Sequence, residues 1–253
     1  MKIRALAAPR NIGFALMLSL SAGLQAADIK VMSTNGVKAV LEELAPQFEK
    51  ATGHKLAIRF APAADLKVQI EKGEAFDLAI LTAAAIDDLI KQGKLAAPTR
   101  ADIAKSGAGV AYRKGATKPD ISSGDAFKRA MLAAKSVAYV GTGATGAEVR
   151  KIFERLGIAD EMKAKTKLLS GVSAAAAVAK GEAELGFSQV SELMGIEGAV
   201  LAGPFPPGFE VQTVFPAAVG TGAREPAAAQ ALIKFLTAPA AAPVIKARGM
   251  EPG

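Results

Sequence analysis

Short apolar runs alternate along the chain with longer segments in which apolar residues recur at the helical period. The run 29–32 predicts a strand, and 36–51 predicts a helix because its apolar residues fall on one stripe. Gly53 suits the left-handed conformation that ends a helix. The same order of strand, helix and glycine repeats over 56–73 and 76–93. Three such units in a row predict a parallel sheet with crossover helices.

A second block with the same order follows an interruption. The segment 94–106 is polar and contains proline, so it predicts a loop. The extended run 107–112 comes next, and we interpret it as a strand that crosses between two lobes. Strands and helices then alternate from 125 to 188, with helices that end at Gly157 and Gly181. The pattern therefore predicts a second α/β lobe.

The last part of the chain predicts a return to the first lobe. A loop over 204–208 precedes an extended run over 211–220, and helices are predicted over 226–236 and 240–248. A strand and two helices after the second block are most simply placed in the first lobe, so that two crossings form a hinge. The predicted parts are a signal peptide over 1–26, lobe I over 27–109 and 219–253, and lobe II over 110–218.

The first residues have the layout of a secretory signal peptide. Three basic residues precede an uncharged apolar run over 12–24, and Ala26 and Ala27 offer small residues for cleavage after either of them. The apolar run is shorter than the roughly 20 residues of a membrane-spanning helix, which leaves an uncleaved anchor as the alternative. We therefore expect a periplasmic protein.

Composition narrows the class of protein. Removal of the leader takes away three basic residues and no acidic one, which lowers the formal net charge from +7 to +4. That excess suits an anionic ligand, but the chain lacks the dense Lys/Arg runs of a nucleic-acid-binding protein. The chain contains no cysteine, so its stability must come from its core and not from disulfides.

Three motifs point to a known family. Ile29–Gly36 reads Ile-Lys-Val-Met-Ser-Thr-Asn-Gly, Phe76–Leu81 reads Phe-Asp-Leu-Ala-Ile-Leu, and Gly181–Phe187 reads Gly-Glu-Ala-Glu-Leu-Gly-Phe. Over nearly the whole mature chain the sequence resembles the periplasmic molybdate-binding proteins of ABC transporters. The resemblance implies a type II periplasmic-binding fold, with two α/β lobes joined by a two-strand hinge. It also implies a small anionic ligand between the lobes and, as partner, an ABC transporter permease in the inner membrane.

The positions that contact the oxyanion in that family differ here. Gly36 takes the place of a serine whose hydroxyl faces the ligand, and Thr34 and Asn35 are the nearest polar substitutes. Ala63 and Ala64 lie in a second loop that is rich in serine in the family. The resemblance therefore places these residues at the ligand without supplying the same hydroxyl groups.

A third ligand position also differs, because Gln189 stands where the family has a tyrosine late in lobe II. The ligand is therefore open between a molybdate-like oxyanion and an organic acid such as a di- or tricarboxylate. A secreted enzyme or sensor on the same scaffold is the third hypothesis.

Four loops lead from a predicted strand into a predicted helix, where backbone N–H groups and the positive helix end attract anions. They are 33–36, 61–65, 141–146 and 170–173. Each hydroxyl in them has an alternative role as a cap of its own helix. The candidate hydroxyl groups belong to Ser33, Thr34, Thr142, Thr145, Ser170 and Ser173.

The loop 141–146 matches the pattern G-x-G-x-x-G between a strand and a helix. A dinucleotide site would also need an acidic residue at the end of the next strand, which ends instead at Leu169 and Ser170. We therefore expect either an anion cradle that includes Gly146 or a plain glycine-rich turn.

Arg113 is the candidate for clamping a carboxylate, because it ends the interlobe strand and its guanidinium group can bind bidentately. The alternative is a solvated surface arginine. Lys38, Arg59 and Arg150 also lie near predicted cleft segments.

No catalytic residue is predicted. The segment 186–190 approaches the G-x-S-x-G nucleophile elbow but lacks its second glycine. The single histidine, His54, follows a helix-ending glycine, and we place it at the surface. One histidine and no cysteine predict no tight transition-metal site. We expect a monomeric binding protein that uses no metal or cofactor and is not an enzyme.

Overall fold

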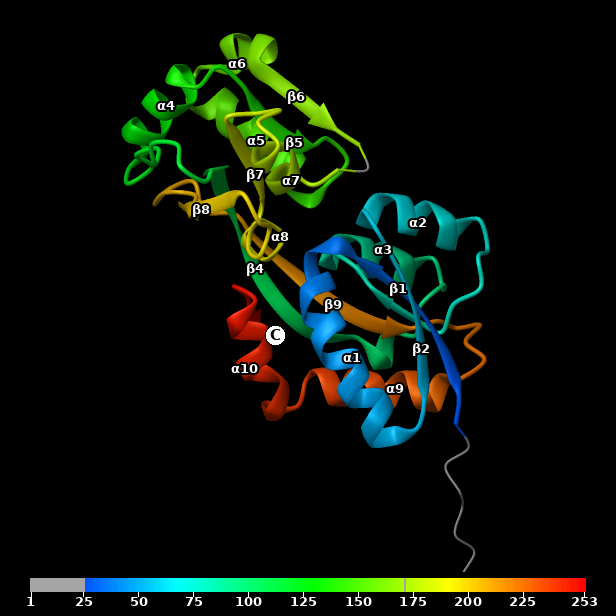
Figure 1. Ribbon diagram of the computed structural model, residues 1–253. Coiled ribbons are helices and arrows are strands. Elements are labelled where there is room, and N and C mark those ends of the chain that lie inside the picture. Colours follow the sequence, from blue (N-terminus) through cyan, green and yellow to red (C-terminus); the bar gives the residue numbers. More distant parts are fainter. Residues whose placement is uncertain (1–25, 171) are drawn as a thin grey trace, which may run out of the picture.

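The structure, a computed structural model, describes residues 26–170 and 172–253 (Figure 1). Apart from Ala26, the predicted signal peptide lies outside the described residues, as does Gly171 of the predicted loop 170–173. The described chain forms two α/β lobes, connected through the long strand β4 (Ala101–Arg113) and through the segment that leads into β9 (Gln212–Val219).

Lobe I, the lower lobe in Figure 1, begins with the alternating elements that the sequence predicts. Its first three strands are parallel, and Val31 pairs with Ile58 on one side and Leu78 on the other. Gly53, with φ +78°, ends the first long helix. The elements are β1 (Asp28–Thr34), η1 (Asn35–Val37), α1 (Lys38–Thr52), β2 (Lys55–Ala61), α2 (Ala63–Glu71), β3 (Leu78–Ile80), α3 (Ala83–Lys91) and η2 (Ala97–Thr99).

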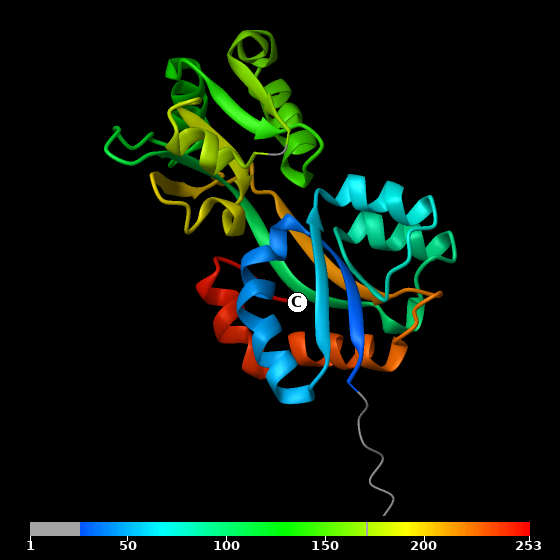
Figure 2. The ribbon, with the colours of Figure 1, turned by 45° about the vertical axis from the view of Figure 1, so that its right-hand side comes forward.

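Helices cover both faces of the lobe I sheet (Figures 1 and 2). Successive side chains of β3 point to opposite faces because the side-chain period of a strand is two. Leu78 and Ile80 join the core under α1 and α9 (Pro226–Leu236), whereas Ala79 joins the core under α2 and α3. Both faces are buried, which explains the nearly continuous apolar sequence of this strand.

The strand β4 is shared by the two lobes. Its first half pairs antiparallel with β9, from Ala101 opposite Ala217 to Gly107 opposite Gln212. Its second half pairs with β7 (Leu185–Gln189) and β8 (Ala199–Pro204) of lobe II. The prediction that 94–106 is a loop is therefore wrong for 101–106. Its polar residues sit in a strand because β9 and β10 (Glu251–Pro252), far along the chain, pair with it.

Lobe II repeats the strand–helix order around a core rich in phenylalanine. Phe127 and Phe187 lie 6.4 Å apart, centroid to centroid, and Phe205 contacts both. The sequence did not predict α6, which is polar, α8, which has four residues, or β8, whose apolar run ends in Gly203 and Pro204. The remaining elements are α4 (Gly124–Ala133), β5 (Val137–Val140), α5 (Ala144–Arg155), α6 (Ala159–Lys165), β6 (Thr166–Leu169), α7 (Ala174–Ala179) and α8 (Val190–Leu193).

The returning strand β9 lies in the lobe I sheet along its whole length. Its residues pair with the first half of β4 and with β3, as in Ala217 opposite Ile80. These pairings favour a second crossing before Gln212, earlier than the 218/219 boundary expected from sequence; the lobe limits stay a prediction. After α9, the chain ends with η3 (Pro239–Ala241), α10 (Ala242–Ala247) and β10.

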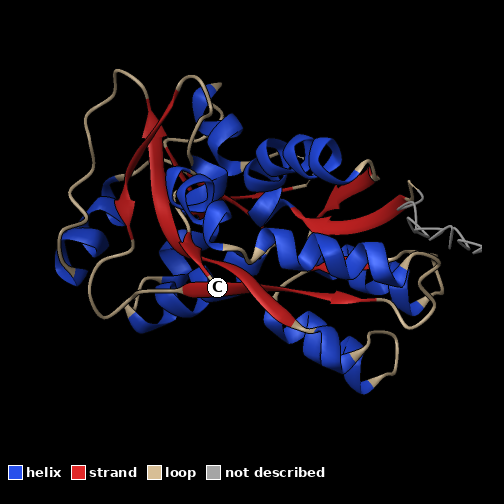
Figure 3. Cartoon of the chain, turned by 90° about the horizontal axis from the view of Figure 1, so that it is seen from below, coloured by secondary structure: helices blue, strands red, loops and turns tan. Residues whose placement is uncertain are grey.

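The fold has the predicted arrangement of layers, with helices on both sides of the strands (Figure 3). In the described part of the chain, no single helix has the length and apolarity of a membrane span. The pair 226–236 and 239–247 passes that test only when joined, and it bends by 58° between its two parts. Leu232 and Ile245 of this pair are buried in the lobe I core.

Candidate functional site

Buried hydroxyl and amide side chains gather where the two lobes meet. We call this group the interlobe cluster and define it as Ser106 of β4, Thr145 of α5, Gln189 of β7, Ser191 of α8 and Thr213 of β9. Four of them are buried, with Thr213 intermediate. Polar groups at such depth need hydrogen-bond partners, and here most partners come from other members of the cluster.

Gln189 lies at the centre of the interlobe cluster. Its Nε2 donates to Thr145 Oγ1 at 2.9 Å and to Thr213 Oγ1 at 3.0 Å. Its Oε1 is buried and has no hydrogen-bond partner among the described residues. Because both threonine oxygens accept from Gln189, their own hydrogens remain available to donate to a ligand.

Ser191 joins lobe II to the first loop of lobe I. Its Oγ donates to the Gly36 carbonyl oxygen at 2.7 Å, and its backbone N–H donates to Ser106 Oγ at 3.5 Å. The bond to Gly36 thus connects the segment after β7 with the loop after β1.

The first predicted loop lies against this junction. Ser33 and Thr34 end β1 and are 0% and 6% exposed, and Ser33 Oγ donates to the Thr34 carbonyl oxygen at 3.2 Å. Asn35 is exposed at the start of η1. The structure thus brings the end of β1 to the interlobe cluster through Gly36.

Phe215 fills the space beside Gly36. A Cβ atom added at position 36 would lie 2.5 Å from the ring of Phe215, which comes from β9. A serine at this position would therefore require the phenylalanine ring to move. The glycine at position 36 is thus matched by a specific side chain on another strand.

The second predicted loop supplies no hydroxyl group. Ala63 and Ala64 open α2 after Pro62, and both reach the surface at least in part. β2 leads into this loop, and its last residue, Ala61, pairs with Thr34. Ala63 and Ala64 therefore lie at the same edge of the sheet as the end of β1.

Two backbone N–H groups of the glycine-rich loop bond within the β5–α5 turn. The Gly143 N–H donates to the Val140 carbonyl oxygen at 3.1 Å, and the Gly146 N–H donates to that of Gly143 at 3.1 Å. A Cβ atom on Gly146 would lie 2.5 Å from the Val140 carbonyl oxygen, so glycine permits the close packing of α5 against β5. These contacts favour the reading of a turn, with Thr142 exposed and Thr145 buried.

Ser173 caps its own helix, which is the alternative to ligand binding for its hydroxyl group. Its Oγ accepts from the Ala176 N–H at 3.1 Å, which caps α7. Ser170 is exposed.

Arg113 lies away from the interlobe cluster. In the antiparallel pair of β4 and β7, Ala108 is opposite Gln189, whereas Tyr112 is opposite Leu185 at the other end of β7. Arg113 follows Tyr112 and is exposed. The expectation that it clamps a ligand together with the loops at the hinge is therefore not met, because β4 runs away from the hinge as it enters lobe II.

Glu192 adds a titratable group next to the cluster. Ser188 Oγ donates to its Oε2, and the Gln189 N–H also bonds to the carboxylate. Burial of the carboxyl group raises the pKa of Glu192, and these two hydrogen bonds offset part of that rise. The carboxyl group of Glu192, beside the interlobe cluster, therefore keeps its proton to a higher pH than an ordinary glutamate does.

His54 is buried, contrary to its predicted place at the surface. It is 5% exposed, its Nδ1 accepts from the Ala27 N–H at 3.1 Å, and its ring stacks on Phe48. It thus anchors the start of β1, far along the sheet from Gln189.

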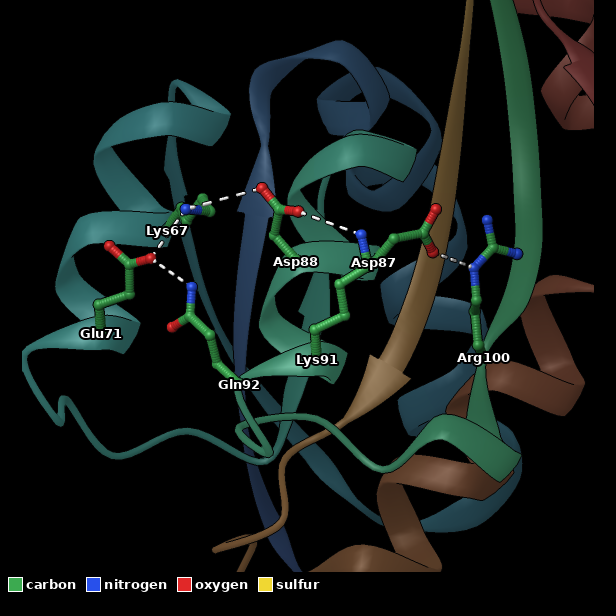
Figure 4. Close-up of polar contacts among 7 residues, drawn as sticks. All are labelled: Lys67, Glu71, Asp87, Asp88, Lys91, Gln92 and Arg100. Atoms are coloured by element: carbon green, nitrogen blue, oxygen red, sulfur yellow. Dashed lines mark hydrogen bonds and ion pairs between the residues drawn. The ribbon is translucent and has the colours of Figure 1, made fainter.

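A second polar network lies on the surface of α2 and α3 (Figure 4). Lys67 Nζ pairs with Glu71 at 2.8 Å, and Gln92 Nε2 donates to the same carboxylate at 2.8 Å. Arg100 Nε pairs with Asp87 at 2.8 Å. These contacts tie α2, α3 and the start of β4 together, so the acidic residues of α3 have structural partners.

Sequence reasoning found Thr145 and Gln189 but missed Ser106, Ser191 and Thr213. These three lie on strands or on a four-residue helix, outside the four strand-to-helix loops in which the sequence predicts anion-binding groups. The usable signal was position alone, because Ser191 comes two residues after Gln189, the last residue of β7. Their grouping depends on pairing between distant strands, such as Ser106 opposite Thr213.

Two α/β lobes that share their crossing strands and bury hydrogen-bonding groups at the hinge define a ligand-binding protein of the hinged type. The chain belongs to the family of bacterial extracellular solute-binding proteins, whose sequence pattern matches residues 29–251. This is the family of substrate-binding components of ABC transporters, and the predicted resemblance to its molybdate-binding members is confirmed.

Two relatives of known name are similar along most of their length. The aconitate isomerase of a Pseudomonas species is 34% identical over 229 residues, which cover 88% of this chain and 87% of that protein. The molybdate-binding protein ModA of Azotobacter vinelandii is 32% identical over 250 residues, which cover 92% of this chain and 96% of that protein.

Solved structures confirm the type II periplasmic-binding fold. The periplasmic molybdate-binding protein of Azotobacter vinelandii superimposes with a TM-score of 0.75 at 22% identity, over 89% of this chain and 99% of its own. The sulfate-binding protein SubI of Mycobacterium tuberculosis H37Rv gives a TM-score of 0.74 at 17% identity, over 89% and 87%.

Proposed function

We propose that this protein binds a small organic polycarboxylate of the aconitate class between its lobes, in the periplasm, and presents it to an ABC permease of the inner membrane. The family supports solute binding and the transporter link. The signal-peptide layout of residues 1–26 supports export. We further propose that the protein acts as a monomer, with the second crossing between its lobes just before Gln212.

The contact between Gly36 and Phe215 carries the proposal for the ligand. A side chain at position 36 would meet the Phe215 ring at 2.5 Å, so the hydroxyl expected to face an oxyanion has no room here. The ring itself is buried in the lobe I core, so position 36 offers a ligand no side-chain hydroxyl group, which disfavours the oxyanion contact expected there. The Pseudomonas relative named for aconitate supports the same choice.

The interlobe cluster supplies neutral donors for carboxylate groups. The hydroxyl hydrogens of Thr145 and Thr213 have no acceptor among the described residues, and Gln189 holds both oxygens in place. Lys38 begins α1 directly after the Gly36 loop and brings a positive charge beside it. Hydrogen bonds to an ionised ligand are stronger than neutral ones, so a few such donors suffice for specific binding.

Ligand-induced thermal stabilisation tests the proposal. We expect cis- and trans-aconitate to raise the melting temperature of the purified protein, with molybdate, tungstate and sulfate having no effect. A ligand at about 100 times its Kd stabilises by about 2.7 kcal/mol, which is a shift of a few degrees for a protein of this size. Stabilisation by molybdate and tungstate alone would overturn the choice of ligand and restore the oxyanion hypothesis.

An isomerase acting on aconitate is a second candidate, favoured by the raised pKa of Glu192 beside Gln189. Isomerisation by proton shift removes a C–H proton while the double bond moves, and returns a proton to another carbon. A carboxyl group with a raised pKa can accept and then donate that proton.

Proton NMR of trans-aconitate incubated with the protein tests this second candidate. Conversion to the cis isomer that is lost in Glu192→Gln, with binding retained, would support it. Binding without conversion by the wild-type protein would exclude it and leave the transport function.

A further inference from the structure

A cavity of about 650 Å³ opens on lobe II, away from the interlobe cluster. It lies between the end of β4, helix α4 and the turn that leads into β7. Tyr112 and Arg113 line it from β4, at the end of that strand remote from the hinge. The residue that the sequence singled out for binding a carboxylate is thus placed in a separate cavity.

The floor of this cavity is made of small apolar side chains. Helix α4 presents Ala126, Ala130 and Ala133 to it, with Leu185 of β7 beside them. The short side chains leave the volume open, and the volume falls within the range of about 300 to 1,000 Å³ that small-molecule sites occupy.

The rim is positively charged. Arg113, Arg129 and Lys118 line the cavity, and none of them has an ion-pair partner in the described part of the chain. Arg113 rests beside Gly181, where a Cβ atom would lie 3.2 Å from its guanidinium group. Glycine at this turn therefore leaves room for the arginine to lie over the cavity edge.

Two carboxylates also line the cavity, but both have other partners. Asp120 accepts from Ser122 Oγ at 2.7 Å and from the Ser122 N–H at 3.0 Å. These two bonds, with a smaller contribution from the charge of Arg129, lower the pKa of Asp120. Glu184 Oε2 accepts from the Lys135 N–H at 2.7 Å. The rim therefore has three cationic side chains and two carboxylates, and both carboxylates already accept hydrogen bonds from other residues. The rim thus carries an excess of positive charge.

We propose that this cavity is a second ligand site, which takes a small monocarboxylate. The carboxylate pairs with Arg113 and Arg129, and the hydrocarbon part covers the alanine floor of α4. A planar guanidinium group matches the two oxygens of a carboxylate. The concave shape favours a small molecule over a protein segment, and the site is independent of the interlobe ligand.

Titration of the full protein with benzoate, butyrate and acetate tests the proposal. Binding is monitored through the amide chemical shifts of α4 and Tyr112. We expect saturable shifts, with benzoate and butyrate tighter than acetate because they cover the apolar floor. Benzamide is the neutral control and should produce no saturable shift. The double variant Arg113→Met with Arg129→Met should weaken binding by at least about tenfold, as loss of charge-assisted hydrogen bonds predicts.

Matched variants separate this site from the interlobe site. Arg150→Met removes an exposed arginine of α5 and should leave the shifts unchanged. Gln189→Leu should also leave them unchanged, even if it abolishes aconitate binding, so the two proposals fail separately. Circular dichroism of the arginine variants confirms that they are folded.

Three results would overturn the second site. They are the absence of saturable shifts with every carboxylate, equal binding of benzamide, and full binding by the double arginine variant. If only an acidic peptide such as hexaglutamate causes shifts, the cavity is part of a protein-docking surface and the proposal of a small-molecule site is wrong.

Discussion

At the residue scale, Gln189 shows how one buried amide can organise a site. It is 2% exposed and its two donor bonds reach Thr145 in lobe II and Thr213 on the returning strand. An apolar side chain of similar size cannot hold the two hydroxyl groups, which then turn toward other acceptors. The role of Gln189 is therefore to fix the direction in which the threonines donate.

Gln189→Leu should weaken ligand binding by about tenfold, since a typical net hydrogen bond contributes about 0.5–1.5 kcal/mol. Titration calorimetry with aconitate measures the change. Gln47→Leu, on the exposed face of α1, is the matched control and should bind as the wild type does. Equal affinity of the Gln189 variant would remove this residue from the site.

Glu192 makes a prediction about pH. Burial raises its pKa above the ordinary value near 4.5, so the folded protein holds this proton more tightly than the unfolded chain. Its stabilising contribution is therefore complete below the ordinary pKa and is lost as pH rises through the raised value. Glu192→Gln should therefore lose less stability than the wild type as pH rises above the ordinary pKa of a glutamate.

Urea unfolding at several pH values measures this difference. Glu197→Gln, at an exposed position nearby, should follow the wild-type curve. Parallel curves for the wild type and Glu192→Gln would contradict a raised pKa.

At the element scale, Asp77 holds three segments together. Its Oδ2 accepts from the Lys30 N–H of β1 at 2.8 Å, and its Oδ1 accepts from the Arg224 and Glu225 N–H groups at 2.7 and 3.1 Å. Residue 225 is the N-cap of α9, so the carboxylate satisfies donors at that helix start. These bonds connect the first strand with the start of α9, a helix near the other end of the chain.

Asp77→Ala should destabilise the protein by about 3 kcal/mol, because it removes the buried carboxylate that accepts from three backbone N–H groups. Asp77→Asn keeps one acceptor oxygen and should lose less. Chemical denaturation with a two-state fit gives both values. An Ala variant within about 0.5 kcal/mol of the wild type would show that water replaces the carboxylate.

Most elements of lobe I were predictable because each carries its own signal. Glycines at 53, 73 and 93, all with positive φ, follow helices whose apolar stripes are clear. The elements that were missed lack such signals: α8 has four residues, β10 has two, and the first half of β4 is polar. They form because distant segments pair with them, which no local pattern reports.

At the scale of the whole molecule, we expect the hydrogen bond between Ser191 and Gly36 to depend on lobe closure. Its hydroxyl bonds to the Gly36 carbonyl oxygen of the other lobe at 2.7 Å. A ligand that binds both lobes shifts the equilibrium toward the closed form by its differential affinity. Loss of one interlobe bond should therefore shift the ligand-free protein toward the open form.

Ser191→Ala should lower energy transfer between dyes at Val68→Cys on α2 and Ala147→Cys on α5 in the absence of ligand. The chain has no native cysteine, so both dyes attach only at the introduced positions. Saturating aconitate should raise transfer in both proteins. A dye pair within lobe I, at Val68→Cys and Lys91→Cys, should not respond; equal transfer in the two ligand-free proteins would show that this bond does not govern closure.

Local sequence alone was sufficient for most of the longer strands and helices, for the alternation of strand and helix in two blocks and for the family resemblance, because apolar period and helix-ending glycines act over a few residues. The composition of the interlobe site depended on the folded chain. Antiparallel pairing of β4 with β9 and β7 brings Thr213 and Ser106 to Gln189 and carries Arg113 to a different cavity. Strand register between distant segments decides such distances, and a single sequence carries no local signal for register.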